Sequence, residues 1–212
     1  GRARFWALGL AVCGFLSVLL FPLARMASVA LAVAAFFVVM LAVENRRRAF
    51  TAGVVGAVVL GAAAMAHAPL RARFLAADTS EGSGERGALL RAGLEAVSQH
   101  PLLGTGLGRF RPSHFVGEKA PSLVLEHTGK AHNQFVTIAA EGGVVALLLF
   151  VWVLAWLARR MDSRDPLGIA GLGALVLFGL LSLTHDPLFH ASFSAGLTLV
   201  LGMAVARGSG AH

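Results

Sequence analysis

The sequence predicts an all-α polytopic membrane protein with about six transmembrane helices and one long external loop. The chain of 212 residues is 57% apolar and only 14% charged, which excludes disorder and differs from an ordinary soluble domain. Six stretches are long and apolar enough to cross a hydrocarbon core of about 30 Å, which takes about 17–25 helical residues. A long polar stretch separates the third of them from the fourth.

The expected spans cover residues 5–22, 27–43, 50–68, 134–157, 166–184 and 188–206. They divide the chain into three parts. Residues 1–68 hold three transmembrane helices, residues 69–131 form the external loop, and residues 132–212 hold three more helices and a short cytoplasmic tail.

The formal charge of +7 comes from basic residues that lie between the apolar stretches. If six helices alternate across the bilayer, the arginines of the short connections and of the ends fall on one side, except Arg25. Short arginine-rich connections face the cytoplasm, so both ends are expected there and the 69–131 loop outside. The eight lysines and arginines of that loop do not oppose this orientation, because loops above about 60 residues are exempt from the rule. No nucleic-acid partner is expected, since no basic stripe with interleaved aromatics occurs.

The chain opens at Gly1 without an initiator methionine or the parts of a signal peptide. We therefore expect an amino-terminal part of the protein to be missing. The single cysteine, Cys13, lies inside an apolar run, which leaves no internal disulfide and no thiolate metal site.

The external loop is predicted to contain one short amphipathic helix over about 84–99. Ser83 and Glu85 form an N-cap and an acidic first turn, and Pro101 closes the helix. The glycine-rich stretch 102–108 follows. It comes after a helix instead of a strand and has no P-loop lysine, so a tight turn that seats the loop is favoured over a phosphate-binding loop.

Arg86 shares one face of this predicted helix with Leu90, Leu94 and Val97. That face is expected to turn toward protein or membrane. A desolvated charge needs a partner, which makes Arg86 a candidate functional residue, and a solvated surface arginine is the alternative.

His132 is the candidate general base. It precedes the 134–157 helix, whose positive end disfavours the imidazolium, and a neutral imidazole can accept a proton near pH 7. The alternative is a histidine that lies at the headgroup level. No metal site is expected, because the histidines lack i, i+4 pairing and suitable carboxylates. His185 and His190 flank a turn with Asp186, which we interpret as an interfacial turn in preference to a ligand site.

Several segments between 83 and 157 together carry a family pattern, namely Ser83-Gly84-Glu85-Arg86, 100–108, Ala131-His132-Asn133-Gln134, and 141–145 with the apolar helix beyond. They resemble the superfamily of O-antigen ligases and polymerases, which are integral-membrane glycosyltransferases. The ligase signature is a histidine, then Asn, Ser or Gln, nine residues, and a glycine-led turn, and it falls on His132, Asn133 and Gly143. Arg25 is similar to the family arginine that opens a helix on the outer side. An arginine that anchors at the headgroups is the alternative.

The resemblance implies a GT-C-like enzyme of the bacterial inner membrane with a periplasmic catalytic loop. It implies transfer of a glycan from an undecaprenyl-diphosphate carrier to an acceptor hydroxyl, in first place on lipid A-core, by an inverting, metal-independent reaction without cofactors. The implied catalytic residues are His132, Arg86 and Arg25. The arginines would hold the diphosphate and His132 would take the hydroxyl proton. Arg25, Arg86, Arg109 and Asn133 are the implied substrate-binding residues.

Two sibling activities share this donor chemistry. An O-antigen polymerase passes one lipid-linked glycan to another, and a protein O-oligosaccharyltransferase uses a protein acceptor. From another class, a non-catalytic transporter component would need ionisable residues or broken helices at mid-membrane depth, and the predicted spans show almost none. Family members are longer, so the chain resembles their carboxy-terminal half. The expected partners are the lipid-linked donor, the acceptor, membrane lipids and the missing amino-terminal half.

Overall fold

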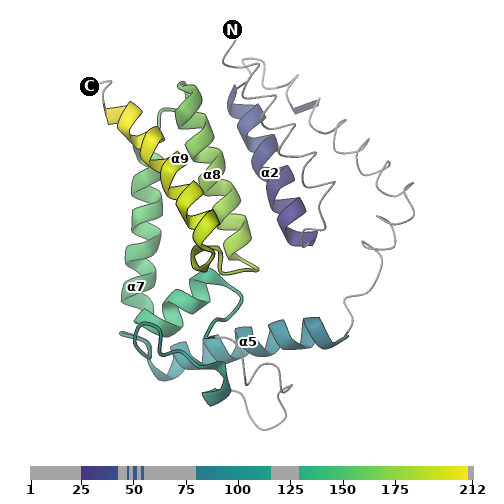
Figure 1. The fold of residues 1–212 in the computed structure, drawn as a ribbon, viewed down its shortest axis with the longest axis vertical. Coiled ribbons are helices and arrows are strands. Elements are labelled where there is room, and N and C mark those ends of the chain that lie inside the picture. The colour runs from purple at the N-terminus through teal and green to yellow at the C-terminus, as the bar shows by residue number, and fades with distance from the viewer. Residues whose placement is uncertain are drawn as a thin grey trace. The chain divides into compact units, whose positions relative to one another are not determined.

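The computed structural model describes residues 25–42, 80–115 and 129–209, together with positions 47, 50, 51 and 54. Helices make up most of this part of the chain, and it contains no strand. In chain order the elements are α2 (Arg25–Ala42), α5 (Ser80–Gln99), the 3-10 turn η1 (Pro112–His114), α7 (Gln134–Arg159), α8 (Pro166–Ser182), the 3-10 turn η2 (Pro187–Phe189) and α9 (Ala191–Ser209) (Figure 1). The predicted all-α class is confirmed for these residues.

Four of the predicted spans correspond to described helices, namely α2, α7, α8 and α9. The predicted span 5–22 and most of 50–68 lie outside the described residues. Helix α8 begins where the sequence predicts, because Asp165 caps it through the N–H groups of Leu167 and Gly168 and Pro166 suits its first turn. Helix α9 begins later than predicted, because η2 precedes it.

Two described helices have the length and hydropathy of a membrane span. They are α7 over Gln134–Arg159 and α9 over Ala191–Gly208. Helix α8 and the Ala30–Ala42 part of α2 are apolar but shorter. These helices agree with a membrane protein, while the number and direction of crossings stay predictions.

The chain forms two compact units. The first contains residues 1–77, 160–177 and 199–212, and the second contains residues 78–159 and 178–198. Helices α8 and α9 therefore contribute one end to each unit. Every residue of the candidate site described below belongs to the second unit, except Arg25.

Helix α8 approaches its neighbours in the first unit closely through glycines. A Cβ at Gly171 would lie 2.7 Å from both the Ala204 Cβ and the Met161 sulfur, and a Cβ at Gly173 would overlap Val38. Larger side chains at these positions would push the helices apart.

Helix α5 begins at Ser80, so the predicted N-cap at Ser83 is wrong. Ser80 followed by Glu81 gives the same type of start signal three residues earlier. The helix ends at Gln99, as predicted from Pro101, which cannot continue it.

The buried residues of α5 are mostly small, with Leu89 as the one large side chain among them in the described part. Ala92 and Ala96 are completely buried, whereas Leu90 and Leu94 of the predicted apolar face are exposed, as is Arg86. Of the predicted face, only Val97 packs against the described protein, where it contacts the core around Phe110. The helical pattern selects large apolar residues, but a close approach between helices requires small ones.

Candidate active site

Helix α7 is broken at Gly143. The backbone there has φ 68° and ψ −171°, a region that belongs almost entirely to glycine, and the helix turns sharply between its two segments (Figure 1). A break leaves backbone carbonyl and N–H groups without helical partners. The loop that follows α5 supplies these partners through three hydrogen bonds of 2.8 to 2.9 Å, from Thr105 N–H to Ala140 O, from Gly106 N–H to Glu141 O, and from Val144 N–H to Pro101 O.

The loop and the break meet backbone to backbone. A Cβ at Gly104 would overlap the Glu141 carbonyl, and a Cβ at Gly143 would overlap the Leu102 carbonyl. The prediction that the glycine-rich stretch is a tight turn that seats the loop is thus confirmed. Two of its N–H groups bind α7 and are not available to a phosphate.

The break also corrects the expectation that the spans are continuous helices. Hydropathy does not register an interruption by two glycines, Gly142 and Gly143, in an otherwise apolar stretch. The interruption is tolerable at a membrane because the loop satisfies the freed backbone groups.

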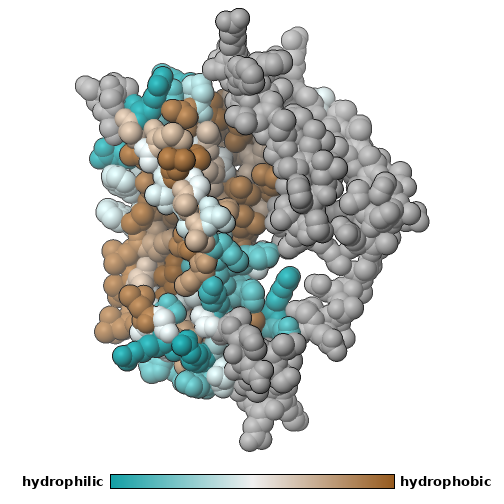
Figure 2. Space-filling view, in the orientation of Figure 1, coloured by the Kyte–Doolittle hydropathy of each residue, from teal (hydrophilic) through white to brown (hydrophobic). Residues whose placement is uncertain are grey.

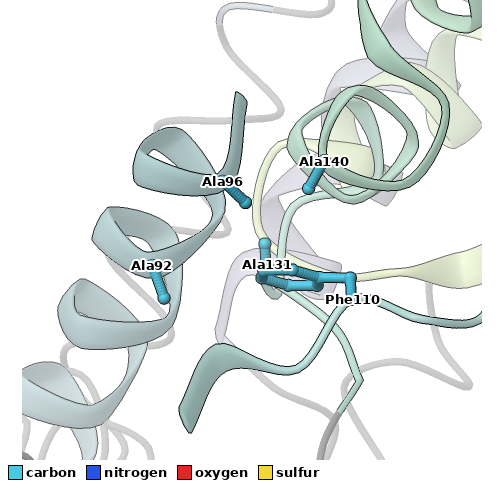
Figure 3. Close-up of a cluster of buried hydrophobic side chains, with 5 residues drawn as sticks. All are labelled: Ala92, Ala96, Phe110, Ala131 and Ala140. Atoms are coloured by element: carbon cyan, nitrogen blue, oxygen red, sulfur yellow. The ribbon is translucent and has the colours of Figure 1, made fainter. Parts of the chain in front are cut away.

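Phe110 holds the loop in place. Its ring is completely buried among four alanines that come from α5, from the segment before α7 and from the first segment of α7, namely Ala92, Ala96, Ala131 and Ala140 (Figure 3). One large ring therefore fills the space that four small side chains leave. This core fixes the chain directly before His132.

His132 and Asn133 lead into α7. His132 is half-buried, and it is the one non-glycine residue of the described part with a positive φ, of 52°. Asn133 caps the helix, because its Oδ1 accepts hydrogen bonds of 3.1 Å from the N–H groups of Phe135 and Val136. Its Nδ2 donates to the Leu183 carbonyl at 3.0 Å. The unusual backbone of His132 is therefore held between a buried core and a capped helix. These two supports fix the position of the backbone atoms from which the imidazole side chain projects.

The segment that links α8 to α9 is fastened to the start of α7. The N–H of Gln134 donates to the His185 carbonyl at 3.1 Å, and its Oε1 accepts from Leu188 N–H at 3.1 Å. The Thr137 hydroxyl donates to Asp186 Oδ1 at 2.6 Å. Gln134, Thr137 and Asp186 are all buried, so these bonds are protected from competing water.

Several charges act on His185. Burial is the main cause that lowers the pKa of His185, and electrostatic interactions with Arg86 and His132 lower it further. His190 adds a small lowering effect, while the carboxylate of Asp186 opposes the shift. Arg86 and His132 thus each act on His185, although the three residues come from three separate segments. Because its pKa is lowered, His185 stays neutral to a lower pH than an ordinary histidine does.

Two of the predicted catalytic residues, Arg86 and His132, thus share an electrostatic partner in His185. Within the described part of the chain, neither the guanidinium of Arg86 nor the ring of His132 makes a hydrogen bond. Arg109 is exposed on the loop, and Asn133 uses its amide in the helix cap. Arg25 is the first residue of α2, as expected of an arginine that opens a helix, and its participation in the site stays a prediction.

Gln134, Thr137 and Asp186 were not predicted as site residues from the sequence. The sequence did contain one signal, namely polar residues in the first turn of an apolar span. Such residues need hydrogen-bond partners inside the protein. The partner of Thr137 is 49 residues away in sequence, and no local pattern identifies it.

Comparison with known proteins gives a family match over a large part of the chain. Residues 9–151 match the family model described as O-antigen ligase. This range is well over half of the chain and includes α5, the docked loop and the break in α7. No curated protein matches the chain significantly.

Proposed function

Because the chain belongs to the O-antigen ligase family, we propose that it transfers a glycan from an undecaprenyl-diphosphate carrier to a hydroxyl group of lipid A-core. The family itself implies a membrane glycosyltransferase of the O-antigen ligase or polymerase type. The observation that carries the proposal is the placement of His132 at the start of α7, where the His185 carbonyl accepts from Gln134 N–H and where Arg86 and His132 both act on His185. An arginine and a neutral imidazole are the groups that this transfer requires.

In the proposed reaction the acceptor hydroxyl attacks C1 of the sugar from the side opposite the diphosphate. The new bond between C1 and the acceptor oxygen forms while the bond between C1 and the phosphate oxygen breaks. The electron pair of the broken bond leaves with the diphosphate, and His132 accepts the hydroxyl proton. A single displacement of this kind inverts the configuration at C1.

Arg86 supports a diphosphate site next to this base. Its side chain is exposed at the site and its charge reaches His185. The planar guanidinium can donate two parallel hydrogen bonds to phosphate oxygens and can stabilise the charge that grows on the leaving diphosphate. In the proposal Arg25 adds a second guanidinium, and Arg109 and Asn133 contact other parts of the substrates.

The hydrogen-bond network at the start of α7 has a positioning role in this proposal. Asn133, Thr137 and Asp186 connect the start of α7 to the segment that carries His185. They hold the two imidazoles on a fixed support, which favours catalysis because small displacements of a reacting group reduce the rate strongly.

The experiment that tests the function uses the full protein in lipid nanodiscs with a lipid-linked glycan as donor. One reaction contains lipid A-core and the other does not, and the matched control is the His132→Ala variant. The ligase is supported if glycan becomes joined to lipid A-core and no product forms in the reaction that lacks lipid A-core. Chain extension without lipid A-core supports a polymerase in its place, and absence of any transfer contradicts the proposal.

A further inference from the structure

The loop that follows α5 carries three leucines that no described part of the protein covers. Leu102, Leu103 and Leu107 are 65%, 75% and 84% exposed, more than any other large hydrophobic residue of the described part. Single exposed leucines are ordinary, but three within six residues form a local apolar surface that calls for a partner.

These leucines have a fixed position. The hydrogen bonds of Thr105, Gly106 and Val144 fasten the loop to the break in α7, and the Leu102 carbonyl lies directly against Gly143. A mobile loop could fold its leucines away from water, whereas this loop holds them beside the break.

The exposed apolar surface of α7 begins at the break, beside the three leucines. Beyond the break it is formed by large hydrophobic residues that are 39% to 63% exposed, among them Val144, Val145, Leu148, Leu149 and Trp152. In Figure 2 the hydrophobic surface along α7 reaches down to the level of the docked loop, where hydrophilic side chains of the α5 region take over. The loop leucines therefore continue the surface that a membrane-spanning helix presents to lipid.

The length of α7 places this surface relative to the bilayer. The straight segment 144–159 has 16 residues, which gives about 24 Å at about 1.5 Å per residue. A hydrocarbon core is about 30 Å thick, and the segment ends at exposed Arg159, which belongs in water or among headgroups. The first segment of α7 turns away from this direction (Figure 1). The straight segment is therefore shorter than the hydrocarbon core is thick. At the other end of α7, the break and the docked loop occupy the rest of that thickness.

Basic residues follow the leucines directly. Arg109 is exposed two positions after Leu107, and Arg111 and His114 come next on the same loop. Arginine beside an immersed apolar segment reaches headgroup phosphates with its charged end.

We propose that the 102–107 loop is seated in the bilayer boundary at the end of α7 opposite Arg159, with Leu102, Leu103 and Leu107 among phospholipid acyl chains. In this position the loop sets the depth of the break in α7, and with it the position of His132, relative to the hydrocarbon core. The proposal concerns the lipid bilayer and does not depend on the reaction at His132.

The test measures where single spin labels lie in the intact protein. The native cysteine is removed by Cys13→Ser, and labels are attached at Leu103→Cys and Leu107→Cys. Leu149→Cys on α7 is the control for a lipid-facing position, and Ser98→Cys on the exposed polar side of α5 is the control for water. The protein is placed in vesicles of phosphatidylethanolamine and phosphatidylglycerol, and collisions with dissolved oxygen and with a water-soluble nickel complex are compared.

Oxygen concentrates in hydrocarbon and the nickel complex in water. We expect the labels at positions 103 and 107 to have an oxygen-to-nickel ratio close to that at position 149 and several-fold above that at position 98. A ratio like that at position 98 would show that the loop lies in water. Protection from both reagents would show that protein covers the leucines, and either result would overturn the proposal. None of these readings requires enzymatic activity.

Discussion

His132 and Arg86 both act on His185, yet the surroundings of the two histidines differ. His132 is half-buried on a backbone with positive φ, and its ring makes no hydrogen bond in the described part of the chain. The ring of His185 lies 2.9 Å from the Thr184 hydroxyl through its Nδ1. His132 is therefore the imidazole available to a substrate hydroxyl, and His185 is the one that the protein holds.

This difference predicts unequal effects of two substitutions. His132→Ala should reduce the rate of glycan transfer by about 10²–10⁴-fold, because general base catalysis contributes about that much. His185→Gln should reduce it less, since glutamine keeps a polar group at that place. Transfer rates of the purified variants in nanodiscs, at matched protein levels, check both. Equal losses, or a larger loss for His185→Gln, would assign the base to His185.

Arg86 allows a second prediction at the residue scale. Arg86→Ala should lower the transfer rate by about 10²–10³-fold, as removal of a donor that stabilises developing charge does. The transfer rate of Arg86→Lys should exceed that of Arg86→Ala by at most about tenfold, because an ammonium lacks the planar fork that matches two phosphate oxygens. The measurement is the rate at saturating donor. Full activity of Arg86→Lys would show that the site needs a positive charge but no bidentate contact.

At the scale of elements, the break in α7 makes Gly143 a sensitive position. Gly143→Ala places a Cβ against the Leu102 carbonyl on a backbone that alanine adopts poorly, and this should cost about 1–3 kcal/mol in the free energy of unfolding. The matched control is Gly179→Ala in α8, where a Cβ meets no atom within 4 Å and alanine should stabilise the helix by up to about 1 kcal/mol. Thermal unfolding in detergent measures both. Similar melting temperatures for the two variants would mean that the break is not a stable feature.

The buried contact between α7 and the segment before α9 gives a prediction that separates hydrogen bonding from shape. The Thr137 hydroxyl donates to Asp186 and accepts from Ala131 N–H at 2.9 Å. Thr137→Val keeps the volume but leaves both partners unsatisfied, which should destabilise the protein by about 1–3 kcal/mol.

Thr137→Ser keeps the hydroxyl and should restore most of that stability. If thermal unfolding ranks the serine variant below the valine variant, packing of the Thr137 methyl group outweighs the hydrogen bonds.

These elements show how far the sequence predicts the site. Four helices were predicted to within a few residues, because each is a long apolar run with a local start signal such as Asp165 before Pro166. His132, Asn133 and Gly143 were predicted as a family motif, but the physical role of Gly143 appears only when the loop 101–106 docks on it. The apolar face of α5 was assigned to Leu90, Leu94 and Val97, and only Val97 packs against the core. Periodicity cannot show that the neighbouring backbone comes close enough to require alanine.

For the whole molecule, a position in a membrane explains three separate observations. Two described helices are suited to a span, the loop leucines continue the surface of one of them, and the polar groups of the candidate site gather at the end of α7 where that surface stops. A lipid-linked donor would carry its diphosphate at this level. The direction in which the helices cross then decides which compartment supplies the acceptor.

The connection between α7 and α8 carries Arg159, Arg160 and Arg164, so the positive-inside rule predicts that it faces the cytoplasm. Residues of α5 should then face the other side. In a Cys13→Ser background, Ser98→Cys should react with a membrane-impermeant maleimide in cells whose outer envelope has been opened, whereas Ser163→Cys should react only after the inner membrane is disrupted. Both positions are exposed on the protein, so access depends on the compartment alone. The reverse pattern would place the arginine of α5 and His132 in the cytoplasm, and the proposed transfer to an acceptor outside the cell membrane would then be impossible.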